Sequence, residues 1–160
     1  MIVWILTAVI ATSEVCAVEP ATGSREESEY CRFQKSGAIE TPYFSVTVEG
    51  GFNVGVDHGG RRLVAQPVLR QSPASFEIEV YDALDPTRVS GCTKEIEFEQ
   101  NGLTWHECVR ESPGVFWRLL RTRVGRGEAV VQYHYSPAGA KFGPALERML
   151  QSTRIKISSP

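Results

Sequence analysis

Apolar and polar residues alternate with a period of two along most of the chain. Within 43–48, Phe44, Val46 and Val48 fall on one side, and hydroxyl-bearing residues fall on the other. Such alternation is typical of a strand with one buried face. Comparable patterns predict further strands at 52–56, 62–68, 75–81, 93–99, 103–109, 115–124 and 128–135.

A glycine-rich stretch surrounds the second of these strands. Gly50–Gly51 and Gly59–Gly60 bracket 52–56, at positions where turns need residues that accept a positive φ. The spacing matches neither G-x-x-x-x-G-K-[ST] nor G-x-G-x-x-G, and no helix-forming run follows. The stretch is therefore interpreted as turns around a strand, and a phosphate-binding loop is not predicted.

Asn101–Gly102 is the strongest short hairpin signal in the chain. A two-residue loop at this position pairs Phe98 with Trp105 and Glu97 with His106. The glutamates that alternate with apolar residues before the loop then line one exposed face of the hairpin. This register is a specific prediction, because a shift of one residue would move every side chain to the other face.

The second predicted hairpin turns at Gly125–Arg126. One of its faces then carries Phe116, Arg118, Leu120, Ala129, Val131, Tyr133 and Tyr135. From Ala138 the apolar spacing becomes helical, at Phe142, Leu146, Met149 and Leu150. A last strand is expected within 152–157. The predicted fold class is α+β, an antiparallel β-sheet meander with a C-terminal helix packed on the sheet.

The N-terminal region has a different character. Ile2–Ala11 is an apolar run interrupted only by Thr7, too short to span a bilayer but as long as the hydrophobic region of a signal peptide. Val15 and Ala17 suit cleavage after Ala17, although no Lys or Arg precedes the run. A buried first strand and a lipid-attachment signal ending at Cys16 are the alternatives to this interpretation.

This interpretation divides the chain into a signal peptide at 1–17, an N-terminal arm or linker at 18–40 and one folded domain at 41–160. The expected location is the periplasm, with no membrane-spanning segment after removal of the signal. The 160 residues are 42% hydrophobic and 22% charged, which is enough for a single core. The formal net charge of -2 gives no reason to expect nucleic acid or an anionic membrane as partner.

Export would place the cysteines in an oxidising compartment. If Cys16 leaves with the signal, Cys31, Cys92 and Cys108 remain, so at most one intramolecular disulfide forms. In the predicted register Cys92 and Cys108 point to opposite faces. A bridge between them requires a bulge or an irregular strand start near Gly91, and a bridge from Cys31 to either is equally open.

Two stretches of the chain resemble the Mog1/PsbP-like superfamily. YFSVTVEGGFNV at 43–54 is similar to its F-s-V-x-v-P-x-G-W opening, although Glu49–Phe52 lacks the proline and tryptophan. VVQYHYSPAGAKFGPALERMLQSTRI at 130–155 resembles its closing strand, helix and strand. The resemblance covers roughly 43–157 and implies a binding protein. Members include photosystem extrinsic subunits, a Ran-binding factor, bacterial envelope proteins and small exported immunity proteins of type VI secretion effectors.

These observations lead to the hypothesis of a non-enzymatic immunity protein that occludes the active site of a toxic cell-wall or lipid-degrading effector. Loops at one end of the sheet would enter the cleft of the partner, with charged anchors at the rim. The expected partner-binding residues are Asp57, His58, Glu95, Glu97, Glu99, Asn101 and Arg126. The alternative is an envelope small-ligand-binding or homeostasis module, with an apolar cavity lined by Phe116, Trp117, Tyr133 and Tyr135.

The sequence gives little support for catalysis. His58, His106 and His134 lack metal-ligand spacing, and the G-x-S-x-G nucleophile motif is absent, so no catalytic residue, metal or cofactor is expected. His106 is predicted to be the cross-strand partner of Glu97. The cluster of Arg118, Arg121, Arg123 and Arg126 resembles a basic ridge. This cluster suits pairing with the acidic stripe of Glu95, Glu97 and Glu99, or docking on a carboxylate-rich protein partner, better than binding to nucleic acid.

Overall fold

The computed structural model describes residues 15–17, 29–33, 36–68, 73–84 and 91–156, with side chains from residue 36 onward. Its larger sheet contains β2 (Glu29–Phe33), β5 (Phe52–Asp57), β6 (Arg62–Pro67), β7 (Ala74–Tyr81), β8 (Lys94–Gln100), β9 (Leu103–Ser112), β10 (Val115–Val124) and β11 (Gly127–Tyr135). Its smaller sheet contains β1 (Val15–Ala17), β3 (Gly37–Glu40), β4 (Phe44–Val48) and β12 (Arg154–Ile155). Helix α1 (Gly143–Ser152) follows the 3₁₀ segment η2 (Pro137–Phe142), and η1 (His58–Gly60) connects β5 to β6.

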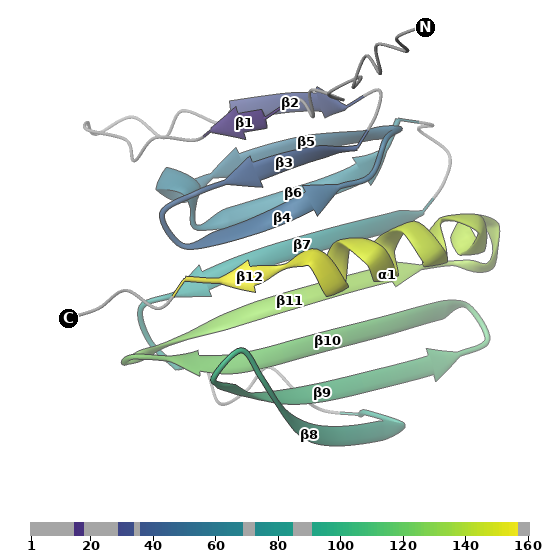
Figure 1. Cartoon of the computed structure of the whole chain (residues 1–160). Helices are drawn as coiled ribbons and strands as arrows, with labels where there is room; N and C mark the ends of the chain where they lie inside the picture. The colour runs from purple at the N-terminus through teal and green to yellow at the C-terminus, as the bar shows by residue number, and fades with distance from the viewer. Residues whose placement is uncertain (1–14, 18–28, 34–35, 69–72, 85–90, 157–160) are drawn as a thin grey trace, which may run out of the picture.

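The larger sheet has the strand order β2-β5-β6-β7-β11-β10-β9-β8, and every neighbouring pair is antiparallel. The smaller sheet has the order β1-β3-β4-β12, in which only β1 and β3 run parallel. The smaller sheet and α1 lie on the same face of the larger sheet (Figure 1). The predicted α+β class, with a mainly antiparallel sheet and a C-terminal helix packed on it, is confirmed.

The core lies between the larger sheet and this cover. It contains the inward residues of β4, β5 and β7 that the alternation predicted, such as Phe44, Phe52 and Phe76, each at most 1% exposed. Leu146 and Met149 of α1 are fully buried against them. The helix packs mainly on β4, β7 and β11. A continuous apolar layer of this kind supplies most of the stabilisation of such a domain.

The structure corrects the predicted single meander in several places. The predicted strand at 43–48 is β4 of the smaller sheet, and β7 pairs with β11 rather than with β8, so the larger sheet is not a simple meander. The last strand, β12, pairs with β4 in the smaller sheet rather than with the larger sheet. Strands β2 and β3 fall within 18–40, the interval predicted as an arm or linker, and Ile39 is fully buried. These strands have four or five residues, too few for alternation to be recognised. The helical spacing was predicted to begin at Ala138, but Pro137–Phe142 form the 3₁₀ segment η2, and α1 begins at Gly143, where Pro144 favours a helix start.

The predicted signal peptide lies largely outside the described residues. Its last three residues, Val15–Ala17, form β1 and pair in parallel with β3. The predicted cleavage point therefore coincides with the end of a strand. Export through a signal peptide at 1–17 stays a prediction. Sequencing the N-terminus of the purified protein would test it directly.

Both predicted hairpin registers are confirmed. Phe98 pairs with Trp105 and Glu97 pairs with His106. Asn101 and Gly102 have φ of 53° and 73°, the two positive values that a type I′ two-residue turn requires. In the second hairpin Val124 pairs with Gly127, so Gly125–Arg126 forms the turn as predicted.

The disulfide joins Cys92 to Cys108, with a Cα–Cα distance of 5.4 Å. The irregular strand start that this bridge required is present. Thr93 N–H donates to Val109 O at 2.8 Å, although Val109 is the register partner of Lys94. Thr93 and Lys94 thus both lie opposite Val109. This arrangement is a β-bulge, and it brings the Cys92 side chain to the face of the sheet that carries Cys108. Gly91 precedes the bulge with a φ of 81°, a value that favours glycine.

Candidate partner-binding surface

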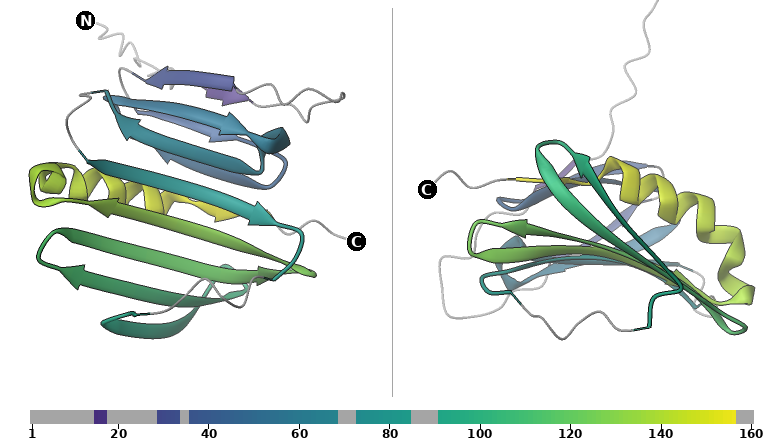
Figure 2. Two further views of the ribbon diagram at one scale, coloured as in Figure 1. Left: turned by 180° about the vertical axis from the view of Figure 1, so that it is seen from behind. Right: turned by 90° about the horizontal axis from the view of Figure 1, so that it is seen from below.

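An acidic stripe, Glu95, Glu97 and Glu99, follows one face of β8. All three glutamates are exposed, and they lie opposite Cys108, His106 and Thr104 of β9. The intervening Phe98 packs against the core, so the stripe faces away from α1. The β8–β9 hairpin bends out of the plane of the neighbouring strands toward the α1 side (Figure 2). The predicted shared and exposed face is confirmed, and its role in binding stays a prediction.

The stripe keeps most of its charge available to a partner. The Nδ1 atom of His106 lies 3.3 Å from Oε2 of Glu97, as the cross-strand prediction proposed, and both side chains are more than half exposed. The Thr104 hydroxyl donates a hydrogen bond to Glu99. Such exposed pairs contribute about 0–1 kcal/mol to stability. All three glutamates remain exposed to solvent.

A hollow of about 370 Å³ adjoins the stripe. It is lined by Glu95, Ile96, Glu97, His106, Glu107, Cys108 and Arg121. Arg121 is held by Glu128, with 2.8 Å between Nε and Oε1, and the Glu128 side chain is 3% exposed. The charge of Arg121 is thus compensated from within the protein. The charge that the hollow presents to a partner is mainly that of the glutamates.

The turns that carry the other predicted residues lie at one end of the larger sheet (Figure 1). Asp57 and His58 are in the β5–β6 connection, Asn101 is in the β8–β9 turn and Arg126 is in the β10–β11 turn. The strand order places about five interstrand spacings, roughly 24 Å, between the first connection and Asn101. Asn101 adjoins the stripe, whereas Asp57 and His58 form a separate group. A single partner would need a broad interface to contact both groups.

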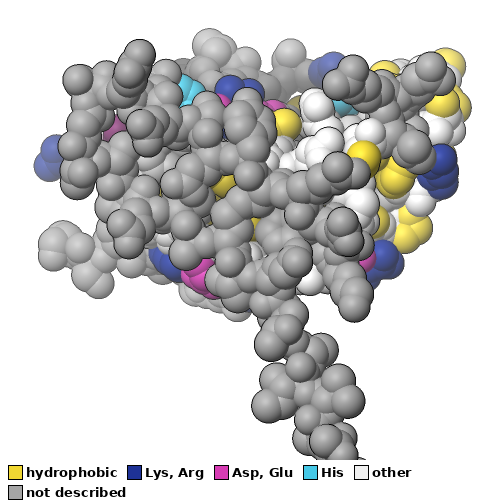
Figure 3. All heavy atoms as spheres, turned by 90° about the horizontal axis from the view of Figure 1, so that it is seen from above, with side chains coloured by type: hydrophobic (Ala, Val, Ile, Leu, Met, Phe, Trp, Pro, Cys, Tyr) yellow, Lys and Arg dark blue, Asp and Glu magenta, His cyan; other side chains and the backbone are white. Residues whose placement is uncertain are grey.

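His58 is exposed, with a φ of 53°, and its Nε2 lies 3.8 Å from Oδ1 of Asp57. His58 is thus an exposed residue of the β5–β6 connection. The side of the molecule near β1 and β2 shows basic and acidic side chains scattered among the described residues (Figure 3).

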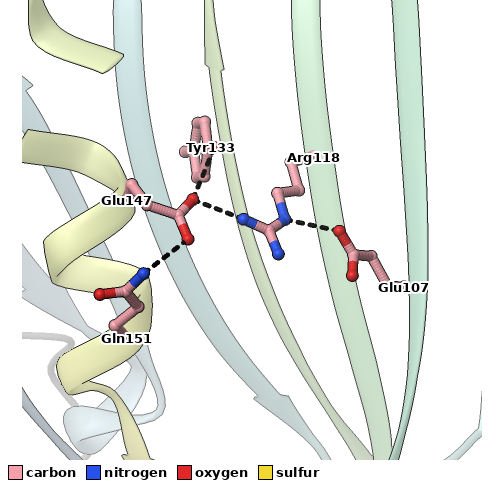
Figure 4. Close-up of polar contacts among 5 residues, drawn as sticks. All are labelled: Glu107, Arg118, Tyr133, Glu147 and Gln151. Atoms are coloured by element: carbon pink, nitrogen blue, oxygen red, sulfur yellow. Dashed lines mark hydrogen bonds and ion pairs between the residues drawn. The ribbon is translucent and has the colours of Figure 1, made fainter. Parts of the chain in front are cut away.

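A polar network that the sequence did not predict lies between α1 and the larger sheet (Figure 4). Arg118 donates from Nε to Glu107 at 2.6 Å and from Nη1 to Glu147 of α1. Tyr133 donates its hydroxyl proton to Glu147 at 2.9 Å, and Gln151 donates to the other Glu147 oxygen at 3.0 Å. Both side-chain oxygens of Glu147 accept hydrogen bonds from within the chain, and the bonds from Arg118 and Tyr133 tie α1 to the larger sheet.

The network shifts the protonation equilibria of its members. Burial by itself would raise the pKa of Glu147, but hydrogen bonds from Arg118 and Tyr133 and the guanidinium charge outweigh burial and hold this pKa below 4.5. Burial and the neighbouring Glu147 raise the pKa of Tyr133 above 10.0. Glu147 is therefore ionised and Tyr133 is neutral at physiological pH.

One signal for this network was present in the sequence. Arg118 was predicted to share a face with Phe116 and Leu120, and an arginine on a buried apolar face needs an acidic partner. The partners could not be identified, because Glu147 lies 29 residues further along, on a helix whose position on the sheet is not a local property.

The apolar cavity of the alternative hypothesis is not formed by the four aromatic residues named for it. Phe116, Tyr133 and Tyr135 stack on one another, with ring centroids 5.0–6.3 Å apart. Trp117 lies on the opposite face, where Nε1 donates to Gln132 at 3.1 Å. Successive residues of a strand point to opposite faces, so Phe116 and Trp117 cannot line one cavity.

The remaining chemistry within the described ranges is sparse. His58, His106 and His134 lie on different strands or turns, and in this part of the chain no group of three metal-binding side chains converges. Comparison with protein-family models, curated proteins and solved structures found no match. Among the described residues, no helix has the length and apolar character needed to cross a bilayer.

The lowered pKa of Glu147 predicts a pH dependence of stability. A carboxyl whose pKa is lowered by folding stabilises the folded state above its unfolded pKa, and this contribution is lost as the pH falls through the folded value. Glu147→Gln is therefore expected to be less stable than wild type at neutral pH, with the difference shrinking progressively below pH 4.5. Urea denaturation at a series of pH values measures this. A difference that is constant with pH would contradict the expectation.

Proposed function

We propose that this chain is an exported, non-enzymatic binding domain of the Mog1/PsbP-like kind, which contacts a protein partner through the acidic stripe. The observation that carries the proposal is the stripe itself. Three carboxylates lie in a row on β8, an exposed strand at the edge of the larger sheet, beside a hollow lined by two of them. Complementary charge on a partner would steer its approach and fix its orientation.

Two further observations support this proposal. The Asn101 turn continues the stripe to the end of the sheet where Arg126 also lies, so hairpin tips and stripe could meet one partner. The Cys92–Cys108 disulfide is of the kind that persists in oxidising compartments, which supports export to the periplasm. The narrower proposal is an immunity protein that occludes a cell-wall or lipid-degrading effector of type VI secretion.

The testing experiment uses the full chain, expressed with its own N-terminus in a bacterium that encodes it, as bait in periplasmic extract. The expected result is capture of one hydrolase at near-equal stoichiometry, with its activity lost in the complex. Capture without loss of activity would support a protein-binding function but would contradict the narrower proposal that the chain inhibits the enzyme. An extract that contains such an enzyme but yields no capture would contradict the proposal and favour the small-ligand alternative.

A charge reversal on the stripe is expected to weaken capture. Glu97→Lys should lower the affinity for the captured partner about tenfold or more, mainly through slower association. Glu111→Lys is the matched control, because Glu111 is exposed on the same hairpin and the net charge changes equally, but it lies on the opposite face. Surface plasmon resonance at several salt concentrations measures both variants. Equal losses for the two would show that overall charge, rather than the stripe, controls binding.

A further inference from the structure

The outer edge of β8 is a feature that the proposed function does not by itself explain. β8 is the last strand in the order of the larger sheet, and within the described residues no strand pairs with its outer side. Six of its seven residues are exposed, and Phe98 is half-buried. An edge strand of this kind can accept a further strand through its backbone N–H and C=O groups.

The hairpin turn determines which residues offer these groups. In a two-residue type I′ hairpin the flanking residues, here Gln100 and Leu103, exchange both of their backbone hydrogen bonds. Hydrogen-bonded and non-bonded pairs alternate along an antiparallel ladder. Glu95, Glu97 and Glu99 are therefore the residues whose backbone groups point away from β9. The residues with outward backbone groups are the same three that carry the acidic side chains.

This coincidence specifies the chemistry of a strand that could pair here. Residues of the added strand directly opposite the glutamates would place their side chains on the stripe face, where Lys or Arg would meet a carboxylate. The alternate residues would face the other side, beside Ile96, which is 39% exposed, and Phe98. The complementary segment thus alternates basic and apolar residues.

A second copy of this chain does not fit the same edge. If two β8 strands paired edge to edge, glutamates would lie across from glutamates, and like charges directly opposite destabilise a sheet. Charged edge residues commonly prevent such self-pairing. The bulge at Thr93 also ends regular pairing at one end of β8 and limits the available edge to Lys94–Gln100.

We propose that β8 accepts an extended segment of a protein partner as an additional strand of the larger sheet, and that this segment alternates Lys or Arg with apolar residues. The proposal rests on the proposed protein-binding function and names its partner chemistry. It differs from general charge attraction in one respect, because the backbone groups of Glu95, Glu97 and Glu99 form hydrogen bonds with the added strand.

The test uses the full chain and a synthetic peptide, slightly longer than β8, in which Lys and Val alternate. Binding is followed by fluorescence anisotropy, and backbone amides are followed by hydrogen exchange with NMR detection. Binding tighter than about 1 mM is expected, with new protection at the amides of Glu95, Glu97 and Glu99. The amides of Ile96 and Phe98 already face β9 and should change little. A peptide of the same composition with all lysines before all valines should bind at least about fivefold more weakly.

Two substitutions distinguish the contribution of the side-chain charge to peptide binding from that of the backbone hydrogen bonds. Glu97→Gln removes one charge and should weaken binding of the alternating peptide about two- to fivefold. Glu97→Pro also removes the outward N–H and adds a ring at the edge, so it should weaken binding at least about tenfold. Proline is tolerated where a strand N–H faces solvent. Unchanged amide dispersion around Trp105 in the NMR spectrum would show that the hairpin remains folded.

Several outcomes overturn the proposal. These are no binding at about 1 mM, equal affinity for the two peptides, binding without protection of the three amides, or a dimer in which these amides are protected without peptide. If Glu97→Lys abolishes capture of the natural partner but the amides stay unprotected in that complex, the proposed function stands and the added strand is excluded. If the peptide adds to β8 but periplasmic capture fails, the added strand stands and the proposed function is contradicted.

Discussion

Arg118→Met is expected to lower the free energy of unfolding by about 3 kcal/mol at neutral pH. The guanidinium bridges Glu107, whose side chain is 10% exposed, and Glu147 of α1. Methionine keeps much of the aliphatic packing but removes both ion pairs. Two carboxylates would then remain half-buried without a cation, which costs more than the net gain from forming the pair.

Chemical denaturation of wild type and variant measures this loss. Arg123→Met is the matched control, because Arg123 lies on the same strand, is exposed and points to the other face, so its loss should change stability by about 0.5 kcal/mol or less. Combining Arg118→Met with Glu107→Gln and Glu147→Gln should restore part of the stability, since the uncompensated charges are removed. A loss as small as that of Arg123→Met would show that the network does not hold α1 on the sheet.

Removal of the disulfide by Cys92→Ala and Cys108→Ala together is expected to lower the free energy of unfolding by about 3 kcal/mol. The bridge closes a loop with a sequence separation of 16, which restricts the unfolded chain. It also fixes the start of β8 at the bulge that precedes Lys94. Differential scanning calorimetry under oxidising conditions should show a clearly lower Tm for the double variant.

A reducing agent provides the control for this prediction. Dithiothreitol should lower the Tm of the wild type by an amount similar to that of the double substitution. Any further effect of dithiothreitol on the double variant would report on Cys16 and Cys31, which lie outside the residues with described side chains. Equal Tm values for the wild type and the double variant without reductant would contradict a stabilising role for the bridge.

The network at Arg118 and the stripe on β8 differ in how far local sequence could predict them. Glu95, Glu97 and Glu99 alternate with Ile96 and Phe98, and alternation alone puts them on one face. Asn101–Gly102 then fixed the register with β9, because a two-residue turn with positive φ at both positions permits one pairing. The exposed stripe and its neighbour His106 could therefore be predicted without any long-range contact.

The bulge shows where local pattern was insufficient. Counting along a regular strand puts Cys92 on the face opposite Cys108, and the bridge forms because Thr93 and Lys94 together oppose Val109. The sequence indicated that a Cys92–Cys108 bridge would require a bulge, but it did not indicate whether the bulge forms. Whether it forms depends on the balance between one disrupted ladder position and the closed disulfide.

The sequence by itself determined the strands from β4 to β11 with their buried faces, both hairpin registers and the presence of the C-terminal helix, because each depends on residues within one turn or one pair of neighbouring strands. Tertiary structure alone decided that β12 joins β4, that β3 belongs to the core and that Glu147 reaches Arg118. These contacts join residues far apart in the chain, and they form because the apolar faces of the larger sheet, the smaller sheet and α1 are buried together. The position of β8 at the end of that sheet, which leaves its acidic edge exposed, was decided in the same way.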